Sequence, residues 1–500
     1  MRGDGHGDQL DEQLRAALSL ADLTMEQLWT RYFALGGEAG PTEVDAFLHG
    51  LAELPVRQRD ILAHAVNERL GEQAPIRRVP YSRVTRDASL DNRTLRALVG
   101  LIEGTHLVPP DRLPAVAAAA GGALNLDLTI YLIDYGQRAL HPYPADDGLA
   151  PLAVDTTLAG RAFRLVQATP VRGEHGRRLW VPLLDGVERL GVLEVVPRDN
   201  TDLNDPGLRV QCRWLATLLG HLITINTELG DSIDAVRMQR PRTTASELIW
   251  QLLPPLTSGM GNFVLAGMLE PCYEIGGDTF DYSMSQTTAW LAIFDAVGHT
   301  LDSGLIAAAA LAAYRGTRRA GHGLDEQARA IDETIAHHFP GGSFVTGVLA
   351  ELDLTSGRLR YINAGHPRPL LLRSGKIVKA LGQGHRRPFG LGVSTVVPGT
   401  ETLQTADWLV LFTDGITEAR DDDGRFFGEA RLVDFLEREA AAGHPPPETV
   451  RRLIHAVMAH QNGVLQDDAT VLLARWLATP GDGVDHEVPD PFERSRHAPD

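Results

Sequence analysis

Four acidic positions in the C-terminal half share one pattern: an apolar β-like segment ends, and an aspartate follows beside a glycine-bearing turn. They are Asp278 in EIGGDTFDY, Asp295 in FDAVGHT, Asp414 in LFTDG, and Asp467 with its neighbour Asp468 in LQDDATVLLAR. Strand ends hold side chains in fixed geometry, and glycine lets the backbone approach closely. Each position alone is typical of an ordinary turn. Four of them in one region favour a common site.

Carboxylates that converge on one point repel each other unless a cation compensates the charge. Mg²⁺ and Mn²⁺ prefer oxygen ligands of this kind and keep several waters, which suits a site built from few side chains. The sequence therefore predicts a divalent metal site. The only two cysteines, Cys212 and Cys272, cannot build a cysteine metal site.

The composition bounds the class of protein. With 500 residues, 43% apolar and 22% charged, the chain is long enough for two or three domains. The formal net charge of −18 argues against a nucleic-acid partner or an anionic membrane, because the field repels phosphates. We find no signal-peptide pattern and no apolar run of about 18 residues, and Cys212 and Cys272 fall in a predicted helix and strand. The expected location is therefore the cytoplasm, without disulfides.

The elements that must position the aspartates follow a helical N-terminal module predicted at residues 1–85. Its signals are a capping box formed by Thr24 with Gln27, and Pro41 in a first helical turn. The module is either a docking or dimerisation element or simply a packed N-terminal cap.

Residues 96–198 combine an alanine-rich helix with strands such as LDLTIYLIDYG and RRLWVPLLDG and a hairpin signal at Asp185-Gly186. In order and pattern this region resembles a GAF domain, a small α/β sensor module. Its aromatic residues Tyr131, Phe163 and Trp180 either line a ligand pocket or form core. His141 and His175 are isolated and have no metal-ligand spacing.

A helical connector is predicted at 205–253, where Pro254 and Pro255 stop the last helix. It either pairs with its copy in a homodimer or only joins two domains. Residues 254–476 carry many short strands and a few helices, which predicts packed sheets flanked by helices. The segment 477–500 is rich in Pro, Asp and Gly and is expected to be a disordered tail.

The ordered motifs EIGGDTFDY, FDAVGHT, NAGHPRPLLL, LVLFTDGITEAR and DDATVLLAR resemble the signatures of the metal-dependent type 2C (PPM) serine/threonine phosphatases. More narrowly they resemble the bacterial SpoIIE-type branch, whose members act in partner-switching control of sigma factors. LIWQLLPP resembles the helix that leads into the catalytic domain of that branch. The resemblance implies a multidomain α+β protein whose C-terminal domain has two packed β-sheets flanked by helices.

The same resemblance implies the site residues. Asp278, Asp295, Asp414 and Asp467 would be the metal-binding carboxylates, with the carbonyl of Ala296 as a further ligand. Two Mn²⁺ or Mg²⁺ ions would be held, and Asp295 would bridge them. Asp278, Asp295 and Asp414 would thus carry the catalysis, through a metal-activated water.

Further candidates surround these ligands. Gly276 and Gly277 would form the turn that lets Asp278 enter the site, and Asp468 would support it. Asp281 either serves beside the ligands or solvates the turn.

Two histidines leave similar alternatives open. His299 suits proton transfer by its ordinary pKa but more readily supports the turn. His366 either lines the substrate entrance or bonds within its own turn. Val297 and Thr300 depart from the branch pattern, in which serine and glycine are usual, and Thr300 is expected to crowd the start of the next helix.

The function implied is hydrolysis of phosphoserine or phosphothreonine in a regulatory protein, an anti-sigma factor antagonist, under control of the N-terminal sensor region. One alternative is a protein that keeps the phosphatase fold to bind a phosphoprotein or sense a signal without turnover. Another is a phosphatase for a small phosphorylated metabolite or nucleotide, although no clamp rich in Lys or Arg lies near the motifs. The presence of all four carboxylates favours the protein phosphatase.

Overall fold

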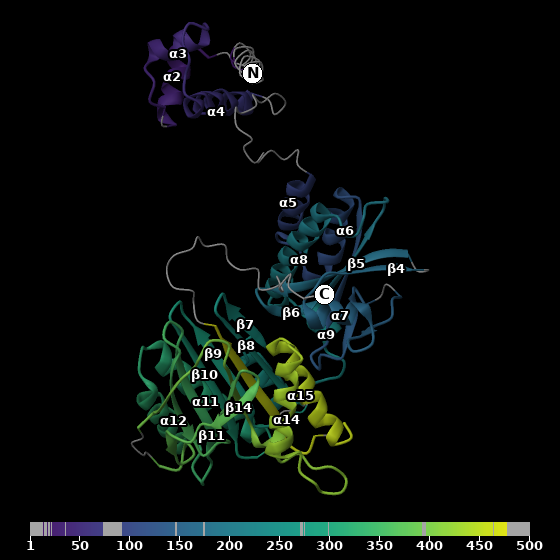
Figure 1. Cartoon of the computed structure of the whole chain (residues 1–500), viewed down its shortest axis with the longest axis vertical. Coiled ribbons are helices and arrows are strands. Elements are labelled where there is room, and N and C mark those ends of the chain that lie inside the picture. Colours follow the sequence, from purple (N-terminus) through teal and green to yellow (C-terminus); the bar gives the residue numbers. More distant parts are fainter. Residues whose placement is uncertain are drawn as a thin grey trace. The chain divides into compact units, whose positions relative to one another are not determined.

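The chain forms two compact units, residues 1–95 and 96–500 (Figure 1). The computed structural model describes residues 14, 18, 21, 23–35, 37–73, 93–145, 148–173, 176–270, 274, 276–298, 300–392, 397–463 and 465–477. Cys272, His175, His299 and the predicted tail beyond Leu477 lie outside these residues.

The N-terminal unit is helical where it is described, with α2 (Met25–Ala34), α3 (Pro41–Leu48) and α4 (Val56–Gln73). The predicted capping box is confirmed: the Gln27 N–H donates to Thr24 Oγ1 at 3.3 Å, and the Thr24 N–H donates to Gln27 Oε1 at 3.0 Å. Leu28, Tyr32 and Phe47 lie in its buried core.

The second unit begins with an α/β domain, called here the upstream domain. Its elements are α5 (Arg93–Thr105), the 3₁₀ turn η1 (Pro110–Arg112), α6 (Leu113–Ala123), β1 (Leu126–Ile133), β2 (Ala139–Tyr143), β3 (Leu152–Ala153), α7 (Leu158–Leu165), β4 (Thr169–Gly173), β5 (Gly176–Asp185) and β6 (Glu188–Pro197). The strands form one antiparallel sheet in the order β3-β2-β1-β6-β5-β4. The predicted hairpin at Asp185-Gly186 joins β5 to β6.

The two faces of this sheet are covered by different helices. One face packs against α5, α6 and the first helix of the predicted connector, α8 (Pro206–Thr227), which buries Cys212. The other face packs against α7, where Tyr131, Phe163 and Trp180 are buried together. These aromatic side chains are therefore core. Two shorter helices, α9 (Ser232–Arg237) and α10 (Thr244–Leu252), continue the chain.

The C-terminal domain follows. Its elements are β7 (Thr257–Met260), β8 (Phe263–Glu270), β9 (Asp278–Met284), β10 (Thr288–Ala296), α11 (Leu301–Arg319), α12 (Leu324–His338), β11 (Val345–Asp353), β12 (Arg358–Ala364), β13 (Leu370–Arg373), β14 (Lys376–Ala380), β15 (His385–Arg386), β16 (Gly399–Thr402), β17 (Trp408–Phe412), α13 (Asp414–Thr417), α14 (Gly428–Ala441), α15 (Pro446–His460) and β18 (Ala469–Trp476).

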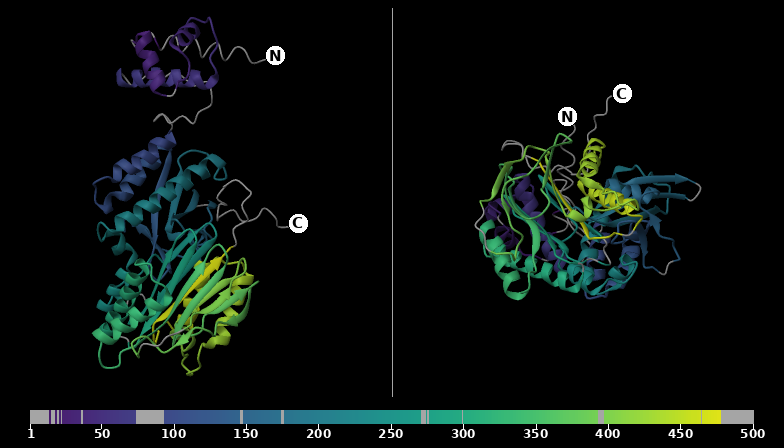
Figure 2. Two further views of the ribbon diagram at one scale, coloured as in Figure 1. Left: turned by 90° about the vertical axis from the view of Figure 1, so that its left-hand side faces the viewer. Right: turned by 90° about the horizontal axis from the view of Figure 1, so that it is seen from below.

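These strands form two packed sheets between two helical layers (Figure 2). The first sheet has the order β15-β12-β11-β10-β9, with β16 beside β12, and is covered by α11 and α12. The second has the order β14-β13-β17-β18-β8-β7 and is covered by α14 and α15. Phe280 of the first sheet and Leu265 of the second share the core between the sheets. The predicted architecture of packed sheets flanked by helices is confirmed. None of the helices in the described residues has the length and apolar content to cross a bilayer.

The upstream domain meets the C-terminal domain at the start of β6, where the Glu188 carboxylate accepts a hydrogen bond from the Thr257 N–H of β7. Burial raises the pKa of Glu188 from 4.5 to about 7, opposed by Arg237, the Thr257 N–H and Arg189. The folded chain therefore binds more protons than the unfolded chain between these two values. The free energy of unfolding falls as the pH rises through this window.

We predict that Glu188→Gln equals the wild type in stability near pH 4.5 and exceeds it at pH 8. Because glutamine keeps an acceptor for Thr257 but carries no charge, the gain should be about 1–2 kcal/mol. Urea unfolding followed by tryptophan fluorescence at both pH values measures it, with exposed Glu103→Gln as the control. A variant no more stable than wild type at pH 8 would contradict the assignment.

Candidate metal centre

The predicted carboxylates come from strand ends of both sheets. Asp278 begins β9 and is the register partner of Asp295 near the end of β10. From the second sheet, Asp414 follows β17 as the first residue of α13, and Asp467 with Asp468 directly precedes β18. Because β17 and β18 are neighbours, the two groups of carboxylates meet at one edge of the sandwich.

The charges of these side chains act on one another. Burial raises the pKa of Asp295 to about 7, and the charges of Asp414, Asp467 and Asp468 add to the shift. The pKa of Asp278 lies well above its ordinary value because of burial, Asp295 and Asp468. Burial and Asp467 likewise raise the pKa of Asp414. Asp278, Asp295, Asp414 and Asp467 thus lie within electrostatic reach of one another at this edge.

Asp468 makes different contacts from Asp467. Its Oδ2 accepts hydrogen bonds from the backbone N–H groups of Gly276, Gly277 and Asp278, at 2.7, 2.8 and 3.3 Å. Burial raises its pKa, and these three donors oppose the shift. The carboxylate therefore ties the second sheet to the turn that carries Asp278, while exposed Asp467 stays at the surface of the site.

Two glycines are required by close backbone contacts. A Cβ on Gly277 would lie 2.4 Å from the carbonyl oxygen of Ala296, and one on Gly415 would lie 1.9 Å from that of Asp468. Both distances are far below contact. The Gly277 position is thus fixed by the approach of β9 to the end of β10, where the Ala296 N–H also donates to Gly277 O at 3.1 Å.

Two threonines that the sequence analysis missed hold Asp278. Thr413 Oγ1 and Thr470 Oγ1 donate to Asp278 Oδ2 at 2.8 and 2.6 Å, and the Thr470 N–H donates to Thr413 Oγ1 at 2.9 Å. All three residues are buried. One oxygen of Asp278 is therefore fixed by the second sheet. The signal was a threonine directly before Asp414 in LFTDG and another three residues after Asp467 in DDAT.

Asp281 lies away from the acidic cluster. Residues three apart on a strand point to opposite faces, so Asp281 faces α11 whereas Asp278 faces the second sheet. Its buried carboxylate is paired with Arg315 at 2.7 Å and Arg318 at 2.7 Å. It anchors α11 to β9 rather than solvating the turn.

His366 is buried and bonded within its own turn. Its N–H donates to Asn363 Oδ1 at 2.9 Å, and its Nδ1 lies 2.8 Å from Thr346 Oγ1. Thr346 Oγ1 in turn lies 3.5 Å from Asp295 Oδ2. Burial lowers the pKa of His366 to about 3, so the ring is neutral at ordinary pH. The histidine therefore supports Thr346 beside Asp295.

Val297 and Thr300, the two residues that depart from the branch pattern, do not prevent formation of α11. Thr300 is the N-cap of α11, with extended backbone angles. Its N–H donates to Ser303 Oγ at 2.9 Å, and Ser303 Oγ donates back to Thr300 O at 2.6 Å. The expected crowding at Thr300 is not seen, because the helix starts one residue later. Val297 is exposed just after β10.

The donor set suits a hard divalent cation. Every candidate ligand is an oxygen, and the main influences on the pKa values of Asp278, Asp295 and Asp414 include no cationic side chain of the described residues. Within those residues, no group of three or more His, Cys, Asp or Glu side chains is placed so that it could hold a metal ion. The site is therefore defined by its converging negative charge.

Comparison with known proteins identifies the domain. The model of the family described as stage II sporulation protein E (SpoIIE) matches residues 285–477. Among proteins of known sequence, the chain is 24% identical over 281 residues to protein IcfG of Synechocystis sp., covering 50% of this chain and 43% of IcfG. It is 22% identical over 208 residues to phosphoserine phosphatase RsbU of Bacillus subtilis, covering 41% of this chain and 61% of RsbU. The matches thus span less than two thirds of either relative.

Solved structures that the comparison matches include the RsbU and RsbW domains of Rv1364c from Mycobacterium tuberculosis. That match has 26% identity and a TM-score of 0.38, and covers 44% of this chain and 61% of that one. The SiaA-PP2C domain of Pseudomonas aeruginosa matches with 21% identity and a TM-score of 0.40, over 50% of this chain and 98% of that one.

The C-terminal domain is thus a phosphatase domain of the PPM (PP2C) class, with two sheets between helical layers and carboxylates at one edge. Within that class, residues 285–477 are of the SpoIIE type. Asp278 precedes the matched segment, yet it lies opposite Asp295 and is held by Asp468.

We predict that Gly277→Ala weakens Mn²⁺ binding about tenfold or more, because the added Cβ forces β9 away from Ala296 O. Calorimetric titration with Mn²⁺ measures the affinity. Gly261→Ala is the matched control, since a Cβ there has no atom within 4 Å. Equal Mn²⁺ affinity in Gly277→Ala and wild type would show that the turn is not part of the metal centre.

Proposed function

We propose that the protein is a Mn²⁺- or Mg²⁺-dependent protein serine/threonine phosphatase. The observation that carries the proposal is the convergence of Asp278, Asp295, Asp414 and Asp467 from two sheets at one edge, where burial and neighbouring carboxylates raise the pKa values of Asp278, Asp295 and Asp414. The SpoIIE family match and the similarity to a phosphoserine phosphatase support the same activity.

In this proposal Asp278, Asp295, Asp414, Asp467 and the Ala296 carbonyl would hold two divalent ions. Bound there, the ions would supply a water of lowered pKa and neutralise the charge of a phosphoryl group. Asp278 presents its free oxygen because Thr413 and Thr470 hold the other.

The surrounding residues keep this geometry. Asp468 holds the turn before Asp278, and Thr346, supported by neutral His366, bonds to Asp295. The role of His299 as a proton donor or a support of the turn remains a prediction from the sequence.

The substrate we propose is a regulatory protein carrying phosphoserine or phosphothreonine, an anti-sigma factor antagonist. RsbU, a relative over part of its length, is a phosphoserine phosphatase. The upstream domain, in its predicted role as a GAF-like sensor, would regulate the activity. The connector, with α8 and α10, would be the contact of a homodimer. The composition supports a protein partner rather than nucleic acid or membrane, and a cytoplasmic location.

We predict Mn²⁺-dependent phosphate release from a chromogenic aryl phosphate and from a phosphoserine peptide. Asp278→Asn and Asp414→Asn should each lower turnover on the order of a hundredfold or more, because each removes a ligand from the centre. Asp325→Asn, an exposed aspartate in the first turn of α12, is the control.

Two outcomes would reject the proposal. Turnover that persists without metal, or in both variants, would place the chemistry elsewhere. Mn²⁺ binding without any turnover of either substrate would instead identify a phosphoprotein-binding protein that keeps the phosphatase fold.

A further inference from the structure

Helix α15 is buried on two opposite sides. Val450, Leu453, Ile454 and Val457 pack with the second sheet. Glu448, Arg451, His455 and Met458 follow each other at spacings of three or four residues and therefore share another face. That face contacts the upstream domain, so α15 lies between the second sheet and the upstream domain.

Arg451 is the centre of this contact and is only 1% exposed. Its guanidinium donates to Glu448 through Nε and Nη2, both at 2.9 Å. From the upstream domain it meets the carbonyl oxygen of Gln137 at 3.3 Å and Asp155 Oδ1 at 2.6 Å. Asp155 is the more exposed partner, at 60% for its side chain.

Arg189 of β6 contacts α15 from the upstream domain. Its Nη2 donates to Gln137 Oε1 and to Pro447 O, both at 2.9 Å, and its Nη1 lies 3.5 Å from Glu448 Oε2. Burial lowers the pKa of Arg189 to about 10, against the opposing effect of Glu448. Arg451 and Arg189 therefore share the buried carboxylate of Glu448 across the domain boundary, with Arg164 of α7 at 4.0 Å from its Oε1.

Two further contacts continue the row along the helix. His455 Nε2 lies 3.0 Å from the Gly136 carbonyl oxygen, and Arg138 Nη2 lies 3.0 Å from Met458 Sδ. The loop between β1 and β2 thus follows α15 for about two turns, from Arg451 to Met458. A buried ionic contact tolerates little displacement, because loss of one partner leaves the other charge uncompensated.

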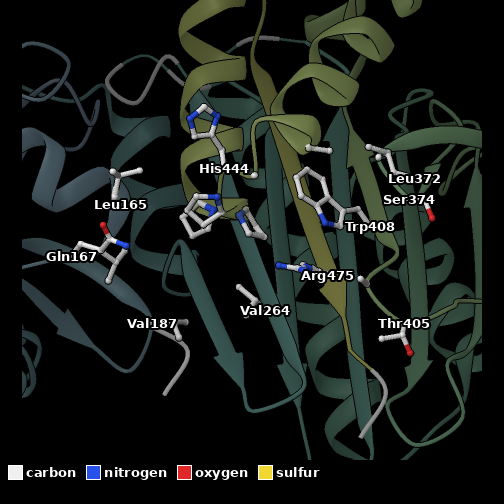
Figure 3. Close-up of a pocket in the computed structure, with 18 residues that line it drawn as sticks. Leu165, Gln167, Val187, Val264, Leu372, Ser374, Thr405, Trp408, His444 and Arg475 are labelled. Carbon is white, nitrogen blue, oxygen red and sulfur yellow. The ribbon is translucent and has the colours of Figure 1, made fainter. Parts of the chain in front are cut away.

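Beside this contact, a cavity lies at the boundary between the upstream domain and the C-terminal domain. A cavity of about 650 Å³ separates Leu165, Gln167 and Val187 of the upstream domain from Val264, Trp408 and His444 of the C-terminal domain (Figure 3). The first turn of α15 lines it through Pro446 and Pro447. The ionic contact, rather than a continuous apolar interface, therefore sets the position of α15 against the upstream domain on this side.

Helix α15 leads directly to the metal centre. It ends at His460, and the chain then passes through Gln461, whose Oε1 accepts from the Gln466 N–H at 3.4 Å. Asp467 and Asp468 come next. Asp468 accepts hydrogen bonds from the N–H groups of Gly276 to Asp278. A shift of α15 would therefore displace Asp467 and Asp468 and, through Asp468, the turn that carries Asp278.

We propose that the upstream domain controls the metal centre through α15, with the buried contact of Arg189 and Arg451 on Glu448 holding Asp467 and Asp468 in place. This route is distinct from the helical connector. It rests on the proposed function only for its effect on turnover, because its effect on the acidic edge can be measured directly.

The test is hydrogen exchange of the full chain, in Arg189→Met and in Asp155→Asn. Both substitutions lie in the upstream domain, outside the metal centre. We expect the amides of α15 and of residues 276–280 to exchange about tenfold faster in both variants, and the Mn²⁺ affinity to fall. Arg198→Met is the control, since its ion pair with Asp127 is exposed.

Each other outcome overturns the proposal. Faster exchange on α15 with residues 276–280 at the wild-type rate would make the contact a docking surface only. Unchanged exchange everywhere would show that the ionic contact does not hold α15. If exchange in Arg189→Met is faster throughout β1–β6, the upstream domain itself is destabilised in that variant. The exchange rates of Asp155→Asn then decide whether the contact holds α15 and residues 276–280. Absence of turnover in the wild type would reject the proposed function but leave the exchange result valid.

Discussion

Repulsion among carboxylates that belong to two different sheets is the constraint on which the C-terminal domain depends. Asp278 and Asp295 come from one sheet, and Asp414, Asp467 and Asp468 from the other. Burial of such groups is unfavourable, so the apolar core between the sheets must hold them together. Backbone N–H groups and threonine hydroxyls compensate part of the charge at Asp468 and Asp278. The negative charge that remains uncompensated would attract a cation.

Much of this site could be predicted from the sequence, because its determinants are local. An apolar strand followed by glycine and aspartate marks a strand end whatever lies beyond it, and the order of these four motifs together with NAGHPRPLLL narrows the choice of fold. The capping box at Thr24 and the hairpin at Asp185-Gly186 are local in the same sense. The turn of Gly276 and Gly277 before Asp278 was also visible in the sequence, but the close contact of Gly277 with the Ala296 carbonyl was not.

The remaining features depend on partners that are distant in sequence. Asp468 is predicted from the sequence to support the site, but its three backbone donors lie nearly two hundred residues earlier in the chain and could not be identified from the sequence. Asp281 of β9 pairs with Arg315 and Arg318 because its side of the strand faces α11. The polar face of α15 is typical of a solvated helix surface, and nothing local reveals that Arg451 is among the largest fully buried side chains.

The strand order of the second sheet also has a consequence for the synthesis of the protein. β18, the last strand, lies between β17 and β8 and is inserted in the middle of the sheet. While the chain emerges from the ribosome, β8 lacks this neighbour, and Asp278 and Asp295 lack the aspartates that precede β18. The upstream domain can fold long before that strand appears. The part of the chain that would exert control therefore exists before there is a centre to be controlled.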